Sequence, residues 1–496
     1  MKRRDLLSGL LAASAIPGAS WAAEFKRAPD GRVPIPAPRP SEIPLPPAEI
    51  SADLRARFGL SGSSGWLAVD LDTGQILDSR NAGRSFAPAS VAKLPTAFFA
   101  LEKLGPTHRF ETTLAVTGEV RAERLSGNLV LKGSGDPELD SDALVPLVLG
   151  LSDLGARSLY GAFLVDDKAI LGFAEIDPEQ PPEAPYNPGL SGLNLNFNRA
   201  RMRWGESGIE LLSWAERLRL PATSIEARAA DDTARIFSHR LQGQREIWEI
   251  ARRALRRPGE RWLPVKAPGI YAGETFRHLA GTYGIALPAP QRAATDGARV
   301  IARHRSRPLA AMLRDMLKFS TNITAEALGA AASGAESPAG SAAAMNAWAA
   351  DLAGFASGDP GFAFVNHSGL TTDSRVSPQR MVDFLRALAR QPGTGHARLP
   401  GPAAGFLKPH NVASEDLSLD YDRLDVVSKT GTMNYIRGLA GYVATPSGRR
   451  LAFAIFSNDL PRRSFGDGLD RRWMGRARGF ERALIRNWVL MADGTG

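Results

Sequence analysis

The segment FAPASVAKLPTAFFALEKLG, residues 86–105, places a serine and a lysine three positions apart at the head of an apolar run. On a helix, side chains three positions apart lie on one face, so the Ser90 hydroxyl and the Lys93 amine can reach each other. A lysine can remove a proton from a serine only when its amine is neutral, which requires burial or a neighbouring cation. The pair also fits a helix start with a solvated lysine, so this motif alone does not identify a nucleophile.

Two later segments carry groups that could hold and protonate a substrate. Ser320-Thr321-Asn322 lies between two predicted helices, where a hydroxyl can relay protons and an amide can hold a substrate carbonyl. Lys429-Thr430-Gly431-Thr432 follows the strand-like RLDVVS and presents a cation and hydroxyls, and its glycine lets a substrate lie close to the backbone. Taken singly, the first segment also fits a helix cap and the second an ordinary strand end.

The order of the three segments is more informative than any one of them. S-x-x-K, S-x-N and K-T-G, in this order, are the signatures of penicillin-binding proteins and serine β-lactamases. The chain resembles the D-alanyl-D-alanine carboxypeptidases/endopeptidases of the penicillin-binding protein 4 type, which are low-molecular-mass, class C penicillin-binding proteins. The resemblance covers nearly the whole chain after the N-terminal segment, and it includes GNLVLKGSGDPEL, NHSGLTTDSRVSP and VSKTGTMNYIRGLAGYVATPSGRRLAFA.

This resemblance implies the catalytic roles. Ser90 is expected to be the acylated nucleophile, which attacks the peptide carbonyl between two D-alanines. Lys93 is expected to be its general base, held neutral in part by repulsion from Lys429. Ser320 is expected to pass the proton to the leaving amine. The backbone N–H groups of Ser90 and Thr432 are expected to form the oxyanion hole.

The resemblance also implies the substrate contacts. Asn322 is expected to bind the substrate amide. Lys429, Thr430 and Thr432 are expected to receive the carboxylate of the terminal D-alanine, and Gly431 to allow its close approach. The implied partners are peptidoglycan peptides with D-Ala-D-Ala termini or cross-links, with β-lactam antibiotics as acylating inhibitors.

Two positions depart from the family pattern. Family members often have Asp-Gly before the Ser-Gly-Leu motif, where this chain has Asn366-His367. His367 fits a loop histidine better than a substrate contact. Aspartate is frequent at the middle of the second motif, where this chain has Thr321, and little loss is expected there because Thr321 lies between the two functional positions.

Two other functions share parts of the pattern. A serine β-lactamase needs a fast deacylating base, but the chain has no ExxLN-like element and lacks the short motif spacing of those enzymes. A catalytically silent peptidoglycan-binding protein would not need three intact motifs. The favoured function is a serine-type D-Ala-D-Ala carboxypeptidase, with the balance between carboxypeptidase and DD-endopeptidase action left open.

The motif spacing predicts how the chain is divided. Ser90 and Ser320 are 230 residues apart, which implies a module inserted between the first two motifs. Short strand-like runs fill residues 111–300, so this module is predicted to be β-rich. The flanking residues 51–110 and 301–496 are predicted to form one α/β (α+β) domain, an antiparallel sheet flanked by helices as in penicillin-binding proteins and β-lactamases.

Apolar periodicity predicts the elements that hold the motifs. Residues 65–82 indicate two strands around a turn, and a helix is predicted from about Ser90 to Leu104. Residues 438–459 predict a hairpin around Pro446-Ser447-Gly448. Two apolar stripes predict helices before the second motif and near the end of the chain, and their members are Leu309, Met312, Leu313, Met316 and Leu317, and Trp473, Ala477, Phe480, Leu484 and Trp488.

Composition excludes several chemistries. The chain has no cysteine, which removes disulfides, thiol catalysis and iron–sulfur clusters, and its 7 histidines form no close ligand pair. Neither a metal nor another cofactor is therefore expected. The net charge of +9 comes from arginines scattered among acids, which fits attraction to an anionic cell-envelope polymer better than nucleic-acid binding.

The N-terminal residues predict export. Residues 1–22 combine a basic start, a short apolar stretch and small residues before Ala22, and Arg3-Arg4 resembles a twin-arginine signal, although an ordinary secretory signal fits as well. The apolar run is too short to span a membrane. Residues 23–50 are proline-rich and predict an extended linker. The mature protein is expected to be soluble in the periplasm.

Overall fold

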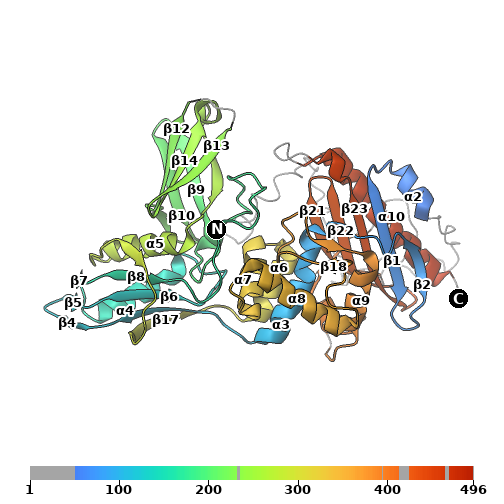
Figure 1. Cartoon of the computed structure of the whole chain (residues 1–496), viewed down its shortest axis with the longest axis horizontal. Coiled ribbons are helices and arrows are strands. Elements are labelled where there is room, and N and C mark those ends of the chain that lie inside the picture. The colour runs from blue at the N-terminus through green and yellow to red at the C-terminus, as the bar shows by residue number, and fades with distance from the viewer. Residues whose placement is uncertain (1–50, 232–234, 394, 413–423, 464–468, 495–496) are drawn as a thin grey trace, which may run out of the picture.

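The computed structural model describes residues 51–231, 235–393, 395–412, 424–463 and 469–494. The predicted export signal and the proline-rich linker lie outside these residues. The described chain forms two parts side by side, a sheet flanked by helices and a β-rich region between β3 and β17 (Figure 1). We call them the sheet body and the inserted region.

The sheet body is built on six antiparallel strands. Their order is β2 (Ile76–Arg80), β1 (Ser63–Asp70), β23 (Arg450–Asn458), β22 (Ile436–Ala444), β21 (Asp425–Met433) and β20 (Lys408–Pro409). The first strand pairs with the last along its whole length, from Ser63 opposite Asn458 to Asp70 opposite Leu451. The early and late parts of the chain therefore complete one sheet, and the predicted hairpins of β1 with β2 and β22 with β23 are confirmed.

Helices cover both faces of this sheet. One face carries α2 (Ser51–Arg57) and α10 (Arg471–Asp493), and the other carries α3 (Lys93–Leu104), α6 (Leu309–Phe319), α7 (Asn322–Ser333), α8 (Pro338–Ala353) and α9 (Pro378–Ala389). Side chains of a strand alternate between the faces. Accordingly, Leu439 and Val443 of β22 pack with α10, whereas Ala440 and Tyr442 pack with the other helices. Every member of the two predicted stripes is buried, so core packing explains them both.

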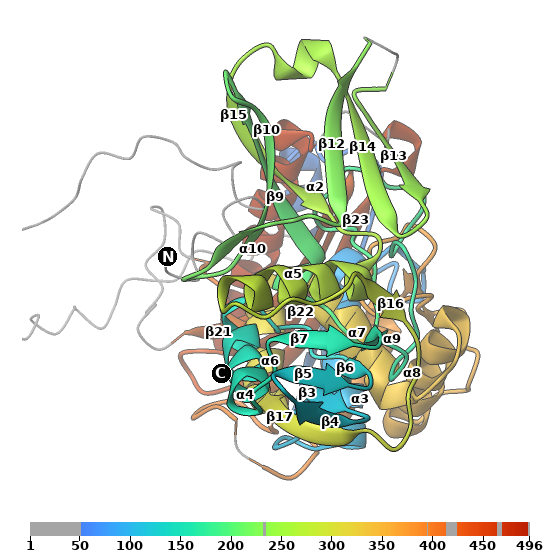
Figure 2. The same cartoon turned by 90° about the vertical axis from the view of Figure 1, so that its left-hand side faces the viewer.

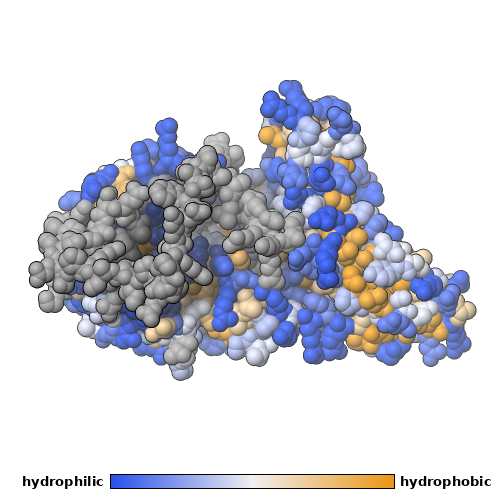
Figure 3. Space-filling view, turned by 180° about the vertical axis from the view of Figure 1, so that it is seen from behind, coloured by the Kyte–Doolittle hydropathy of each residue, from blue (hydrophilic) through white to orange (hydrophobic). Residues whose placement is uncertain are grey.

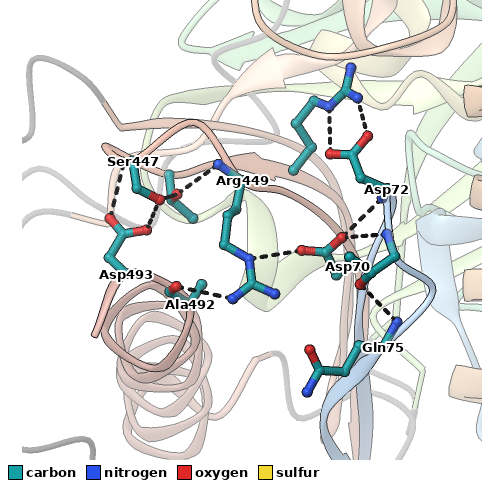
Figure 4. A network of polar contacts seen from close by, with 10 residues as sticks. Asp70, Asp72, Gln75, Ser447, Arg449, Ala492 and Asp493 are labelled. Atoms are coloured by element: carbon teal, nitrogen blue, oxygen red, sulfur yellow. Dashed lines mark hydrogen bonds and ion pairs between the residues drawn. The ribbon is translucent and has the colours of Figure 1, made fainter. Parts of the chain in front are cut away.

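A polar network fixes the end of α10 on the sheet (Figure 4). Asp70 accepts hydrogen bonds from the N–H groups of its own turn and from Arg449 Nε at 2.9 Å. Arg449 also donates to the Ala492 carbonyl at 3.1 Å, and Ser447 donates to Asp493 at 2.5 Å. The two predicted turns and the last turn of α10 are thereby joined, which sets the position of the helix along the strands.

The inserted region contains a five-stranded sheet and three smaller sheets. The larger sheet has the order β16 (Pro290–Arg292), β8 (Phe163–Asp166), β6 (Leu129–Gly133), β3 (Glu111–Val116) and β17 (Arg299–Arg305), with α4 (Val145–Asp153) and α5 (Pro268–Thr282) packed on it. A short side sheet consists of β4 (Glu119–Arg121), β5 (Arg124–Ser126) and β7 (Ser158–Tyr160). In the sheet body, β18 (Phe362–Ala363) and β19 (Arg375–Val376) form a separate small pair.

Two more sheets stand on the far side of α5 (Figure 2). They have the orders β11 (Arg219–Pro221), β10 (Gly208–Trp214), β9 (Arg199–Gly205), β15 (Gly259–Pro264), and β12 (Ile225–Ala230), β14 (Arg245–Ala251), β13 (Phe237–Gln242). One apolar core runs through the whole region, from Leu114 of β3 to Trp248 of β14. The predicted β-rich insertion is confirmed, whereas α4 was not predicted because its short, nearly all-apolar sequence has no clear period.

The outer surface of the inserted region carries both hydrophilic and apolar residues. Seen from behind, its upper end is mostly hydrophilic and apolar residues gather lower down, away from the sheet body (Figure 3). Within the described ranges, every helix is too short or too polar to cross a lipid bilayer.

Candidate active site

The first motif lies at a change of helix type. Ser90 belongs to a 3-10 turn, Ala89–Ala92, and the α-helix begins only at Lys93, so the prediction of one helix from about Ser90 was wrong in this detail. Side chains three apart eclipse each other in a 3-10 turn, which brings Lys93 Nζ to 2.9 Å from Ser90 Oγ. The turn starts from Ala89 at φ 46°, a left-handed conformation that a non-glycine residue adopts only when its surroundings impose it.

Lys93 is fully buried among oxygen atoms. Besides Ser90, its Nζ donates to Asn322 Oδ1 at 2.8 Å and to the Ser368 carbonyl at 2.6 Å. A neutral amine has two N–H groups and one lone pair. Because the amide and the peptide oxygens only accept hydrogen bonds, a neutral Lys93 turns its lone pair to the Ser90 hydroxyl. This is the geometry of a base and its nucleophile.

Burial explains why this lysine can lose its charge. Desolvation lowers the pKa of Lys93 from 10.5 to about 7, and the nearby Glu326 carboxyl opposes the shift. Lys93 and Lys429 also repel each other, and this repulsion adds to burial in lowering the pKa of Lys429.

The second motif joins two helices, as predicted. Ser320 ends α6 at φ 61°, which turns the chain sharply, and Asn322 is the first residue of α7. Lys429 Nζ donates to Ser320 Oγ at 2.9 Å, so the second and third motifs meet. Asn322 uses its oxygen for Lys93, and its Nδ2 donates to the Tyr186 carbonyl of the inserted region at 2.9 Å.

The third motif lies on a strand edge. Its residues pair with β22 on one side, but β20 reaches only Ser428 and Val427 on the other. The free edge faces the turn that carries the nucleophile, and a Cβ at Gly431 would lie 2.2 Å from the Pro88 carbonyl. The approach of the nucleophile's own turn therefore already requires glycine here, before any substrate is considered.

A buried ion pair supports the outer end of the motif. Arg437 donates to Thr432 Oγ1 at 2.7 Å, and its Nε lies 2.9 Å from both carboxylate oxygens of Glu481. Arg437 and Glu481 are both buried. Thr432 is thus held by the sheet and by α10 together, whereas the Oγ of Thr430 makes no hydrogen bond to a described residue.

Glu326 also shapes the site, although sequence reasoning gave it no role. Glu326 lies one helical turn after Asn322 on α7 and accepts from the N–H groups of Ser368 at 2.8 Å and His367 at 3.3 Å. It thereby holds the peptide whose carbonyl contacts Lys93. The i, i+4 spacing from Asn322 was the available signal, but a single glutamate on an alanine-rich helix is not distinctive.

His367 is not a substrate contact. Its side chain is buried, Nε2 lies 2.7 Å from Ser341 Oγ, and a Cβ at Gly329 would lie 2.2 Å from the ring. Burial lowers its pKa to about 4, so the ring is neutral near pH 7. The histidine packs the loop before Ser368 onto α7 and α8, which agrees with the prediction of a local loop role.

All the motif residues meet at one cleft of about 800 Å³ between the sheet body and the inserted region. Ser90, Ser320, Asn322, Thr430 and Thr432 line it, while Lys93, Lys429 and Gly431 lie directly behind its surface. Two other walls complete it. Tyr186, Phe197 and several prolines of the inserted region form one, and Lys408, His410, Arg478 and Arg482 of the sheet body form the other.

The fold and this constellation define a serine acyl-transfer enzyme of the penicillin-binding class. The sequence profile of the D-Ala-D-Ala carboxypeptidase 3 (S13) family matches residues 59–472. The chain therefore belongs to this family of serine D-Ala-D-Ala carboxypeptidases, and the predicted family and enzyme class are confirmed.

Individual relatives agree with this assignment. A D-alanyl-D-alanine carboxypeptidase of Actinomadura sp. (strain R39) is 27% identical over 430 residues, covering 80% of this chain and 77% of the relative. The D-alanyl-D-alanine carboxypeptidase DacB of Haemophilus influenzae is 24% identical, covering 82% and 88%. The crystal structure of penicillin binding protein 4 (dacB) from Haemophilus influenzae has the same fold, with a TM-score of 0.70 at 20% identity over 89% of this chain and 99% of that one.

Proposed function

We propose that this carboxypeptidase cleaves the D-Ala-D-Ala bond of peptidoglycan stem peptides through an acyl-enzyme at Ser90. The contact between Lys93 Nζ and Ser90 Oγ is the observation that carries the proposal, because the amine is buried and its other two partners are pure acceptors. The pKa of Lys93, lowered to about 7, leaves a large neutral fraction at neutral pH.

Each step of the reaction has a candidate residue. Ser90 Oγ attacks the carbonyl carbon while its proton passes to Lys93. The C–N bond then breaks, and the leaving amine receives a proton through Ser320, which is hydrogen-bonded to Lys429. Water attacks the ester, the C–O bond breaks, and Ser90 regains its proton. The N–H groups of Ser90 and Thr432 remain the proposed oxyanion hole, worth about 3 kcal/mol per donor in comparable sites.

The substrate groups are assigned by the atoms still free to bind them. Asn322 Oδ1 is taken by Lys93 and one of its N–H groups by the Tyr186 carbonyl, so the remaining N–H is proposed to meet the substrate carbonyl. Lys429, Thr430 and Thr432 are proposed to receive the terminal carboxylate. The Lys429 amine is fully buried and its pKa is well below 10.5, and an incoming carboxylate favours its charged form.

Labelling with a fluorescent penicillin tests this mechanism. We expect a persistent covalent label that maps to the peptide containing Ser90, with no label on Ser90→Ala, and release of D-alanine from a pentapeptide by the intact enzyme. A Ser90→Ala protein that labels as well as the wild type would overturn the mechanism.

The β-lactamase alternative differs in the fate of the label. Among the described residues that line the cleft, Glu481 is the one carboxylate, and Arg437 engages both of its oxygens. No free carboxylate base for fast deacylation is therefore present among these lining residues. Rapid turnover of nitrocefin in place of a persistent label would favour a β-lactamase.

We also propose that the protein works in the periplasm, since residues 1–22 have the pattern of an export signal. N-terminal sequencing of the mature protein from a Gram-negative host is expected to begin just after Ala22. Replacing Arg3 and Arg4 by lysine is expected to block export if the twin-arginine route is used, and to leave it intact if an ordinary secretory route is used.

A further inference from the structure

One wall of the cleft is built from three cationic side chains and a histidine. Lys408 and His410 lie at β20, and Arg478 and Arg482 lie four residues apart on one face of α10. We call these four residues the cationic wall. All of them line the same cleft as Ser90, and Arg437, which donates to Thr432, is a neighbouring charge of Lys408, His410 and Arg478.

The charges of this wall are not balanced by carboxylates of their own: Glu481 attracts Arg478 and Arg482, but it is ion-paired with Arg437. Within the described part of the chain, no carboxylate lies within ion-pair distance of Lys408, Arg478 or Arg482, and the nearby Glu481 is taken by Arg437. The pKa values record the repulsion. Burial and then Arg437 and Arg478 lower the pKa of Lys408. Burial and then Arg437, Lys408 and Arg482 lower that of His410 to about 4.

A cluster of like charges is unfavourable for folding and attracts anions into a cleft with low-dielectric walls. The wall therefore fits an anionic ligand group. The carboxylate next to the scissile bond is already accounted for by Lys429, Thr430 and Thr432. The wall adjoins the groups proposed to hold that carboxylate, because, in addition to burial, Arg437, which donates to Thr432, lowers the pKa of Lys408, and Lys408 lowers that of Lys429. It would therefore meet a further anionic group carried by the leaving residue.

We infer that the cationic wall binds a second carboxylate, carried by the leaving group of an extended or cross-linked peptide. The inference rests on the proposed function, because that function sets which side of the cleft holds the leaving group. It assigns a preference to this enzyme: amide bonds whose amine half continues as an acidic peptide are cleaved in preference to those that release a free D-alanine or a neutral chain.

Two synthetic substrates with the same acyl half test this preference. In one, the leaving residue is Nε-succinyl-D-lysine, which ends in a carboxylate; in the other it is Nε-butyryl-D-lysine, a neutral analogue of similar length. Exposed ion pairs contribute about twofold to fivefold each. We therefore expect the wild type to prefer the succinyl substrate by about tenfold in kcat/KM at 0.05 M salt, and by much less at 0.5 M salt.

Matched variants distinguish binding by the cationic wall from a general effect of the protein's net charge. For Arg478→Gln/Arg482→Gln we expect the ratio of the two kcat/KM values to fall to about one, and for Arg478→Lys/Arg482→Lys to stay near the wild-type ratio. The control, Arg471→Gln/Arg472→Gln, removes the same charge from exposed residues of α10 that do not line the cleft, and is expected to keep the preference. Equal wild-type rates for both substrates, or equal loss in the control, would overturn the inference.

A binding measurement keeps this test independent of turnover. Calorimetry with Ser90→Ala protein compares free Nε-succinyl-D-lysine with free Nε-butyryl-D-lysine. Tighter binding of the succinyl compound, lost on adding Arg478→Gln/Arg482→Gln, supports the wall even if the acyl-enzyme mechanism fails. Equal affinity of the two compounds counts against the wall, whatever the enzyme does to penicillin.

Discussion

Lys93 and the cationic wall are basic groups of one cleft, but Lys93 is buried whereas the arginines of the wall are exposed to solvent. Lys93 is fully buried, holds three oxygen partners and has a pKa lowered to about 7. Arg478 and Arg482 are exposed and form no ion pair with a described residue, and the nearby Glu481 is paired with Arg437. Desolvation thus converts one cation into a base that acts at a single short distance. Exposure lets the others keep their charge and act over a longer range, where salt weakens them.

Replacing Lys93 should give the largest effect. In Lys93→Met the apolar volume is kept and the base is lost, so we expect acylation by a fluorescent penicillin to slow by about 10³–10⁴-fold. Lys103→Met removes an exposed lysine from the same helix and should acylate at the wild-type rate. A Lys93→Met enzyme within tenfold of the wild type would contradict the role of Lys93.

Alanine substitutions at two glycines compare the crowded surroundings of the nucleophile with the open surface of α10. Gly431→Ala would place a Cβ 2.2 Å from the Pro88 carbonyl and push the strand away from the nucleophile. We expect a loss of about 1–3 kcal/mol of unfolding free energy and about 10²-fold slower acylation. Gly475→Ala on α10 meets open space and should stabilise by up to about 1 kcal/mol at unchanged rate. Thermal unfolding and labelling kinetics measure both, and equal tolerance at the two glycines would refute the contrast.

The pH dependence of acylation should follow Lys93. Since the base must be neutral, kcat/KM is expected to rise with pH through about 7 and then level off. The charges that face Lys93 are Glu326 of α7, which raises its pKa, and Lys429 of β21. Glu326→Gln should therefore move the rise to lower pH by about 0.5 to 1, whereas Glu102→Gln on the surface of α3 should not. A rise that moves upward or stays in place would show that Glu326 does not act on Lys93 through its charge.

The smallest effect should distinguish two histidines with equally low pKa values. The pKa values of His367 and His410 are both lowered to about 4, but neighbouring cations contribute to the lowering for His410 only. Raising salt from 0.05 to 0.5 M should therefore raise the pKa of His410 by a few tenths and leave that of His367 unchanged, as followed by NMR.

Both rings are neutral in the fold and protonate near 6.5 when unfolded. Stability should therefore fall as the pH drops from about 6.5 towards 4.

Much of the site could be predicted from the sequence because short motifs carry their own chemistry. Ser90, Lys93, Ser320, Asn322 and the Lys-Thr-Gly segment meet at one cleft. The stripes of α6 and α10 and the closing hairpin were also predictable, since burial of one helix face or strand face imposes a period on the sequence. The 3-10 turn at Ser90 was not, because its residues also fit the first turn of an α-helix.

The residues that support these motifs carried no such pattern. Glu326, the Ser368 carbonyl and the Tyr186 carbonyl act at the site through contacts between segments far apart in the chain. Each of these contacts uses a backbone atom of one partner, so the residue type of that partner carries no signal. The pairing of Arg437 with Glu481 likewise joins a strand to a helix 44 residues later.

The sequence by itself determined the family, the reaction class and the candidate nucleophile, because these depend on residue types at fixed local spacing. Only the tertiary structure decided the charge of Lys93, the reason for Gly431 and the gathering of Lys408, His410, Arg478 and Arg482 on one wall. The physical reason is that desolvation, steric contact and repulsion depend on which groups face each other across space. Those neighbours are set when the first and last strands close the sheet.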